Sequence, residues 1–424
     1  MIETTARLTQ GVYLAGETVE VAITLRNPSP PPDAKSQWND QEEVLAWASA
    51  QIHCHCWVNQ SRVNVPSAQQ PLSAEEQAVT NTRTSFAPCR VDPEGPYEGS
   101  GPSSSGSGGN MVSVTGRVVT STKPTILFCD LRLLPGESKT FWYKEVLPVE
   151  GPPSFRGQAV KYAYKLTVGT QRVNSAIKLL RVPIRVLVLQ EFTDSAIING
   201  SEDLTPSNPF LSDKEKETPL DSALQVLQVV TSQRNQKFYN ITNARGHVVR
   251  FCIFKQAYKL GEDIVGSLDF SESNVPCIQY AVTLQSVEEI SPECRKNEHQ
   301  RPSINSLSKF HEMCVGFQQS HFVLPVPLHV TPSFYTDLVT LKWRLHFEFV
   351  TSMTDSKTSG LKLSEPPGHD DLDGKIWQAP HNVDIETMVW DLPIKLYPNL
   401  PSYLSQGLQM QTQFHMRINN SNTS

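Results

Sequence analysis

The chain has 424 residues, a formal net charge of −6 and a sequence pI near 6.0. This length exceeds one ordinary hydrophobic core, so we expect two domains, and an acidic balance without any basic block excludes charge-driven binding to nucleic acid. No apolar run is long enough to cross a bilayer, the N-terminus lacks the apolar core of a signal peptide, and the eight cysteines follow no disulfide spacing. We therefore expect a soluble, cytoplasmic protein.

Short segments rich in Val, Ile and Phe recur along the chain and end at Pro or Gly. Their apolar and polar residues alternate, and this period of two predicts β-strands with one buried face. Helical periodicity is confined to brief stretches such as 220–233. The pattern predicts an all-β fold.

The first distinctive stretch is a turn that leads into a strand, Tyr13-Leu-Ala-Gly16-Glu17-Thr-Val19. We expect Gly16 to take a positive φ, which a side chain would oppose, and Glu17 to begin the next strand. Since no helical pattern opens after the glycine, the stretch is not a phosphate-binding loop. Both residues are therefore assigned a structural role.

The run IHCHCWV at residues 52–58 contains four possible metal ligands in a row. In an extended strand His53 and His55 lie on one face, whereas Cys54 and Cys56 lie on the other. Each face offers only two ligands, and structural zinc usually takes four from two separated pairs. A strand with a buried cysteine face is favoured, and a metalloenzyme built around the two histidines is the least favoured alternative.

Two stretches within the first half have compositions that cannot bury enough apolar area to become ordered. Residues 29–40 begin with a proline-rich run, and residues 66–122 contain the low-complexity sequence GSGPSSSGSGGN. We expect both to be insertions into the first domain.

The loop Glu150-Gly-Pro-Pro-Ser-Phe-Arg-Gly157 joins a stiff proline pair to an aromatic and a cationic side chain. Because this composition suits a contact with another protein, Pro152, Pro153, Phe155 and Arg156 are candidate partner-contact residues. A structural turn with Phe155 in the core is the favoured alternative, since part of the loop recurs later in the chain. Under this alternative, Arg156 is the one candidate residue without a structural role.

Residues 191–245 are polar and acidic and are expected to form a linker, with a possible short helix around Leu224 and Leu227. The acidic stretch after residue 352 is expected to be a loop. Residues 401–424 are polar and are expected to be a disordered tail.

The chain repeats its landmarks in one order, beginning with Tyr258-Lys-Leu-Gly261-Glu262, which matches the turn at Gly16. Gly261 and Glu262 therefore receive the same structural assignment. Such a long period indicates a duplicated domain rather than a solenoid, so residues 1–190 and 246–400 are each expected to form a sandwich of two sheets. The later matches pair Leu147-Pro-Val with Leu324-Pro-Val, Pro153-Ser-Phe with Pro332-Ser-Phe, and Val182-Pro-Ile with Leu392-Pro-Ile.

The sequence contains no nucleophile elbow, no P-loop and no zinc-protease motif. Residues 369–374 resemble a calcium loop, but Pro380 stands where the bidentate glutamate belongs. Glu288 and Glu289 are adjacent, so they point apart on a strand and are interpreted as surface charges. The sequence therefore predicts no catalytic residue, no cofactor and no metal.

The repeated turn and the repeated Leu-Pro and Pro-Ser-Phe landmarks resemble the arrestin-like superfamily, in which two β-sandwiches lie end to end. More narrowly, residues 121–166, 172–189 and 338–352 resemble the retrograde Golgi transport protein family. That family is the smaller partner subunit of the complex that activates the Rab-six GTPase. The resemblance covers most of both predicted sandwiches and transfers no active-site residue.

The resemblance implies two tandem arrestin-like β-sandwich domains and a non-catalytic subunit of a guanine-nucleotide exchange factor. Such a factor breaks no covalent bond, because it acts by binding the nucleotide-free GTPase better than the loaded form. The implied partners are a large exchange subunit with a WD-type propeller, the Rab-six type GTPase, met directly or through that subunit, and the Golgi membrane at its periphery. The competing function is an arrestin-like cargo or coat adaptor, since the fold does not choose between these roles.

Overall fold

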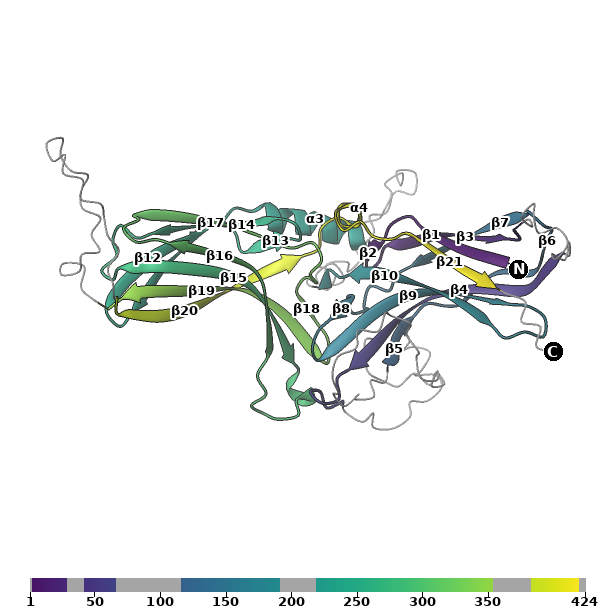
Figure 1. Cartoon of the computed structure of the whole chain (residues 1–424), viewed down its shortest axis with the longest axis horizontal. Helices are drawn as coiled ribbons and strands as arrows, with labels where there is room; N and C mark the ends of the chain where they lie inside the picture. The colour runs from purple at the N-terminus through teal and green to yellow at the C-terminus, as the bar shows by residue number, and fades with distance from the viewer. Residues whose placement is uncertain (1, 29–41, 66–115, 191–218, 354–382, 419–424) are drawn as a thin grey trace, which may run out of the picture.

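The computed structural model describes residues 2–28, 42–65, 116–190, 219–353 and 383–418. The expected insertion at 29–40, most of that at 66–122 and the acidic stretch after residue 352 lie outside the described residues. The described residues form four sheets, which make two units that lie end to end (Figure 1). The prediction of an all-β fold is confirmed, because strands dominate the described part of the chain.

The N-terminal unit packs a four-stranded sheet against a larger one. The smaller sheet has the order β21 (Gln413–Ile418), β1 (Ile2–Leu8), β3 (Thr18–Arg26) and β7 (Ser138–Val146). The larger sheet has the order β2 (Val12–Leu14), β10 (Lys178–Leu187), β9 (Val160–Gln171), β4 (Glu43–Val58) and β5 (Gly116–Ser121), with β6 (Thr125–Leu133) on β4 and β8 (Phe155–Arg156) on β9.

The C-terminal unit repeats this arrangement. Its smaller sheet has the order β11 (Lys237–Asn243), β12 (Gly246–Ile253), β14 (Asp263–Asp269) and β17 (Gln319–Pro325). Its larger sheet has the order β13 (Ala257–Lys259), β20 (Ile385–Tyr397), β19 (Val339–Ser352), β15 (Cys277–Ile290) and β16 (Ser303–Met313), with β18 (Phe334–Tyr335) on β19. A short 3₁₀ helix (Pro292–Cys294) follows β15, and the α-helices of the described residues are α3 (Pro219–Ser232) and α4 (Pro401–Gly407).

Both cores are built from the alternating faces that the sequence predicts. In β9 and β19 every second side chain is buried, and the residues between them face outward. The C-terminal core is rich in aromatic rings that contact one another, with the tilted rings of Phe347 and Phe251 lying 4.8 Å apart between their centres. The buried residues of the two strands are Tyr162, Tyr164, Leu166 and Val168 in β9, and Trp343, Leu345, Phe347 and Phe349 in β19.

The chain's last described segment is ordered, and the expectation of a disordered tail from residue 401 is wrong as far as residue 418. Helix α4 begins at Pro401, and β21 pairs antiparallel with β1 from Ile418 opposite Ile2 to Gln413 opposite Arg7. The physical reason is an apolar alternation within this polar segment, because Ile418 is buried and every second residue before it packs on the N-terminal core.

The position of β21 matches that of β11 in the other unit. In the C-terminal unit β11 precedes its neighbour β12 in the chain, whereas in the N-terminal unit the place beside β1 is filled by a strand from the far end of the chain. Figure 1 shows β21 in yellow, running from the C-terminal unit along β1. The tail therefore connects the two units and completes the first one.

Two other predicted boundaries need correction. Residues 116–121 were expected to lie in the insertion, but they form β5 and pair with β4. Residues 237–243 were expected to belong to the linker, but they form β11 and pair with β12. The expected short helix of the linker is α3. Each of these two strands pairs with the edge of a neighbouring strand that would otherwise lack a partner. The composition of residues 116–121 and 237–243 does not reveal that edge.

Candidate interaction surfaces

The loop with the candidate partner-contact residues lies at the junction of the two units. Pro152 and Pro153 are buried, and the Pro152 carbonyl accepts a hydrogen bond from the Tyr164 hydroxyl at 2.8 Å. Phe155 packs edge to face on Phe334 of the C-terminal unit, with 5.0 Å between ring centres. Phe155 therefore helps to hold the two units of the chain together, Pro152 and Pro153 are buried beside it, and Arg156 alone of the four is exposed.

Polar contacts reinforce this junction around the same loop. The Thr331 hydroxyl donates to the Ser154 carbonyl at 3.0 Å. Arg185 donates from its guanidinium to the Leu328 carbonyl at 3.2 Å and to the Val330 carbonyl at 2.8 Å. Burial lowers the pKa of Arg185 from its ordinary value, but these backbone acceptors suit a charged donor.

Glu288 is a structural residue of the junction that the sequence does not reveal. The interpretation of Glu288 as a surface charge is wrong, because the residue is only 5% exposed. Its carboxylate accepts hydrogen bonds from the backbone N–H groups of Gln158 at 2.7 Å, Ala159 at 2.9 Å and Val160 at 3.4 Å. Glu289 points the other way, toward Lys342 at 2.7 Å. The carboxylate of β15 thus caps the start of β9 across the junction.

The two predicted turns have nearly the same geometry. Gly16 and Gly261 take φ values of 88° and 84°, the positive region that the sequence predicts. The carboxylate of each following glutamate accepts the backbone N–H three residues earlier, Leu14 for Glu17 at 2.9 Å and Lys259 for Glu262 at 2.9 Å. The glutamate is therefore part of the turn, and the predicted repeat exists in three dimensions.

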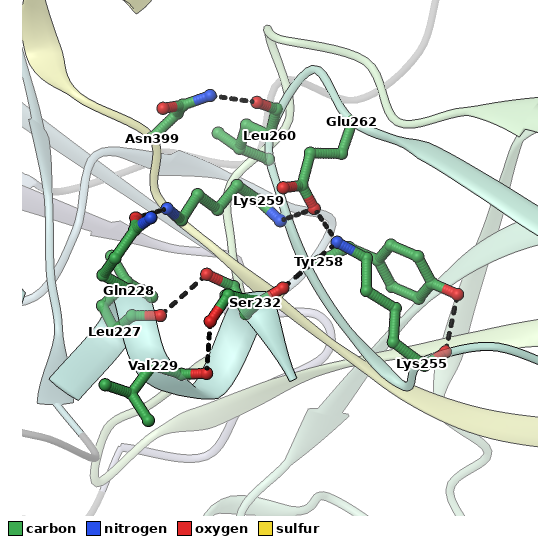
Figure 2. A network of polar contacts seen from close by, with 11 residues as sticks. Leu227, Gln228, Val229, Ser232, Lys255, Tyr258, Lys259, Leu260, Glu262 and Asn399 are labelled. Atoms are coloured by element: carbon green, nitrogen blue, oxygen red, sulfur yellow. Dashed lines mark hydrogen bonds and ion pairs between the residues drawn. The ribbon is translucent and has the colours of Figure 1, made fainter. Parts of the chain in front are cut away.

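The second turn also anchors helix α3 (Figure 2). Lys255 donates to the Glu262 carboxylate at 2.7 Å and to the Thr231 carbonyl of α3 at 3.3 Å. Lys259 reaches Gln228 of the same helix at 2.7 Å. The helix expected in the linker is thus fixed to the C-terminal unit by the turn at Gly261.

The outer face of the larger N-terminal sheet is cationic and aromatic. The Nζ atoms of Lys161 and Lys165 lie 4.9 Å and 5.5 Å from the centre of the Trp57 ring. Arg156 pairs opposite Lys161, and Arg181 lies on the next strand. We call Trp57, Arg156, Lys161, Lys165 and Arg181 the cationic face. Among the described strands of this sheet, β5, β9 and β10 contain no Asp or Glu, whereas β4 has Glu43 at its far end and β6 has Asp130.

The histidines of the 52–58 run lie beside this face. His55 stacks on Trp57 with 5.6 Å between ring centres, and His53 lies within 2.7 Å of the Thr167 hydroxyl. Desolvation, followed by the positive charges of His53, Lys165 and Arg181, lowers the pKa of His55 to about 4. The imidazole of His55 is therefore neutral at neutral pH, mainly because it is partly buried.

The cysteines of the run have the buried face that the sequence predicts. Cys54 and Cys56 are fully buried, and desolvation raises the pKa of Cys54 and raises that of Cys56 to about 12. Such thiols are inert rather than nucleophilic. Within the described ranges no group of three or more His, Cys, Asp or Glu is placed to hold a metal ion. No helix in that part of the chain is long and apolar enough to span a membrane.

The outer face of the smaller C-terminal sheet carries exposed apolar side chains around a shallow hollow of about 480 Å³. Phe238 of β11 is 53% exposed and Val323 of β17 is 47% exposed. Arg250 lies 4.6 Å above the Phe238 ring, and His321 lines the hollow from the opposite side. Most of the lining residues are polar or charged, among them Asp269, Gln319 and Ser320. We call this surface the mixed hollow, and an exposed aromatic ring among polar groups suits a protein contact.

Comparison with known proteins places the chain in a family. A family model described as Rgp1 matches residues 98–189 and 190–352. The human protein named RAB6A-GEF complex partner protein 2 is 44% identical over 424 residues, which cover 97% of this chain and 99% of the human protein. The bovine protein of the same name is 44% identical over 404 residues, with 93% of each chain covered. The chain therefore belongs to the Rgp1 family.

Proposed function

We propose that this chain is a non-catalytic subunit of a heteromeric guanine-nucleotide exchange factor that activates a Rab GTPase of the Rab-six type in retrograde transport at the Golgi. The observation that carries the proposal is the 44% identity, over nearly the whole length of both proteins, to human RAB6A-GEF complex partner protein 2. Exchange requires differential affinity for two states of a GTPase, which broad surfaces supply. The outer sheet faces of both units support the proposal as broad candidate surfaces.

The proposed complex contains a large subunit with a WD-type propeller, the GTPase and a peripheral contact with the Golgi membrane. The mixed hollow is the surface that we assign to the large subunit. Phe238 lines the hollow and is exposed, and Val323 is a second exposed apolar side chain of the same sheet, so the surface offers the aromatic and aliphatic groups that interface cores favour. The edge strands β11 and β17 of the same sheet offer unpaired backbone groups beside it.

The exchange role is tested with purified proteins in solution. Release of a fluorescent guanine nucleotide from the GTPase is measured with the large subunit alone and with the large subunit plus this chain. We expect the rate to rise at least about tenfold when this chain is present, which corresponds to a decrease of about 1.4 kcal/mol in the activation free energy of nucleotide release. Full activity of the large subunit alone would refute the proposed role.

The assigned surface is tested by substituting Phe238→Glu and comparing recovery of the large subunit after affinity purification. The matched control is Val389→Glu in β20, because Val389 is 62% exposed on a different sheet of the same unit. We expect Phe238→Glu to reduce recovery strongly and Val389→Glu to leave it unchanged. Equal recovery of the large subunit with both variants would show that it binds another surface of this chain. That result would leave the proposed exchange role untouched.

A further inference from the structure

Strand β7 is an open edge of the smaller N-terminal sheet. It stands at the end of the order β21, β1, β3 and β7, and within the described ranges no strand pairs with its other side. Its nine residues pair with β3 along their whole length, from Thr18 opposite Val146 to Arg26 opposite Ser138, without a bulge. A long and regular edge of this kind can accept a further strand.

The hydrogen bonds at both ends of β7 show which backbone groups point to the open side. Leu147, directly after the strand, donates to the Glu17 carbonyl and accepts from the Gly16 N–H, both at 3.0 Å. The Glu137 carbonyl, directly before the strand, accepts from the Asn27 N–H at 2.9 Å. Successive residues of an antiparallel strand direct these groups to opposite sides, so the odd-numbered residues bond to β3. The residues whose N–H and C=O groups face the open side are therefore Ser138, Thr140, Trp142, Lys144 and Val146.

We propose that the open edge of β7 pairs antiparallel with the same edge of a second copy of the chain, about a twofold axis at Trp142. The inference goes beyond the proposed function and does not depend on it. In this register the two copies of Trp142 lie opposite each other, and all nine residues of each strand are paired. A contact between identical strands has to be self-complementary, because every pair of residues occurs once on each side of the axis.

Charge complementarity favours this register. Glu145 lies opposite Lys139 of the second copy, so opposite charges meet on both sides of the axis. The Lys139 side chain is 50% exposed and lies 4.0 Å from Glu137, which leaves it accessible to a second carboxylate. A register centred one residue earlier would place Glu145 opposite Glu137, and one centred one residue later would place it opposite Phe141.

Exposed apolar side chains on β7 supply the second argument. Trp142 and Val146 lie on the outer face of the sheet and are 62% and 55% exposed. In the proposed register the two indoles meet across the axis, and aromatic cross-strand pairs are among the stronger side-chain contacts of a sheet. On the inner face Phe141 and Phe128 lie 4.9 Å apart between ring centres, and both are only partly buried at the rim of the core. A second copy would cover this rim.

A second copy fits this edge better than an unrelated extended segment does. An unrelated segment can bind through the backbone groups alone, which gives no reason for the charges of β7 to be complementary about Trp142. The equivalent edge of the C-terminal unit is β17, which contains no Lys, Arg, Asp or Glu and ends at Pro325. Charge pairing with its own copy is therefore a property of β7 and not of β17.

The test is sedimentation equilibrium of the purified full chain, without the large subunit or the GTPase. We expect a reversible conversion of monomer to dimer as the concentration rises. In the dimer the amides of Thr140, Trp142 and Lys144 should become protected from hydrogen exchange, because they gain acceptors. Trp142→Lys places two cations on the axis and removes the aromatic pair, so it should weaken the dimer about tenfold or more.

A charge reversal tests the register itself. Lys139→Glu places like charges opposite each other at two positions and should weaken the dimer about tenfold. Adding Glu145→Lys to the same chain restores opposite charges, so the double variant should regain the dimer. The matched control is Lys144→Glu, which makes the same charge change on the same strand but faces Thr140 of the second copy. This control loses only an exposed pair with Glu20 and should weaken the dimer far less.

Thermal unfolding of each variant separates a loss of association from a loss of folding, and the charge-reversed pair decides the question if Trp142→Lys does not fold. The inference is overturned if the chain stays monomeric up to about 100 μM, where a specific contact would assemble. It is also overturned if Lys139→Glu leaves the dimer unchanged, or if the folded double variant does not regain it.

A third result against the inference is a monomeric chain whose β7 variants lose recovery of the large subunit, which would make β7 a contact with that subunit. Because the sedimentation experiment contains neither the large subunit nor the GTPase, self-association and the exchange role can fail independently of each other.

Discussion

The larger sheets of the two units occupy equivalent positions, yet their outer faces differ. In the C-terminal unit Arg344 lies 2.6 Å from Asp391, and His346 lies 2.6 Å from the same carboxylate. In the N-terminal unit the equivalent region is the cationic face. The buried faces of both sheets are apolar because close packing restricts which side chains fit there. The outer faces are not restricted in this way, so their charged and aromatic side chains differ between the two units.

The units also differ in the origin of one edge strand. The strand beside β1 is β21 from the far end of the chain, whereas the strand beside β12 is the preceding strand β11. This difference predicts the largest effect on stability. A chain that ends at Met410 loses β21, and with it the burial of Ile418 and the packing of Phe414 and Met416. We expect the N-terminal unit to lose about 4 kcal/mol of unfolding free energy and the C-terminal unit to change little. Urea unfolding and hydrogen exchange of the β1 amides measure this.

The control for this truncation ends at Ile418 and keeps β21. It should unfold like the full chain. If the chain that ends at Met410 also keeps its full stability and its β1 amides stay protected, β21 does not complete the N-terminal unit.

The junction predicts the next largest effect. Glu288→Ala leaves three backbone N–H groups at residues 158–160 without their acceptor, so we expect a loss of about 3 kcal/mol in the unfolding free energy. Glu289→Ala removes only exposed ion pairs and should cost less than about 1 kcal/mol. Denaturant unfolding of the two variants gives the comparison, and equal losses would contradict the role of Glu288.

The two glycine turns predict a smaller, unequal pair of effects. A Cβ atom at Gly261 would lie 2.6 Å from Leu328 and 3.2 Å from Tyr403, whereas one at Gly16 would lie 3.3 Å from Val149. Both alanine substitutions incur about 1 kcal/mol for the positive φ. Gly261→Ala should cost about 1 kcal/mol more than Gly16→Ala, because Leu328 has to move. Thermal unfolding of the two variants shows which substitution destabilises the chain more. A larger loss of stability for Gly16→Ala would contradict the predicted clash at Gly261.

The smallest expected effect is a pH dependence of the stability of the N-terminal unit, which comes from His55. The pKa of His55 is about 4 in the folded chain and near 6.5 when unfolded, so the unfolded chain takes up a proton first. Stability is therefore lost as the pH falls from about 6.5 to 4, by about 1 kcal/mol for this partly solvated ring. His55→Gln should flatten this part of the stability profile, and an unchanged slope would show that other groups cause it.

Much of the fold could be predicted from local patterns. The alternation in β9 and β19, the positive φ at Gly16 and Gly261 and the helix at 220–233 depend on side chains that are close in sequence. The assignment of two tandem arrestin-like domains, with their boundaries, stays a prediction. The loop at Pro152 and Phe155 was open to two interpretations, and the structure places both residues at the junction.

The candidate surfaces were harder to predict because they combine distant segments. The alternation of Phe414, Met416 and Ile418 was present in the sequence, but a strand of this length is convincing only when the open edge of β1 is known. Lys161 and Trp57 are far apart in the chain, and only the pairing of β4 with β9 brings them together.

The sequence by itself determined the all-β architecture and the repeated turns, because alternation and glycine geometry act over a few residues. The family followed from the resemblance of longer stretches such as residues 121–166. Only the tertiary structure decided that the tail completes the first unit, that Glu288 caps a strand across the junction and that cations gather around Trp57. These features depend on which strand edges and faces meet, and strand pairing between distant segments is set by the packing of the whole chain.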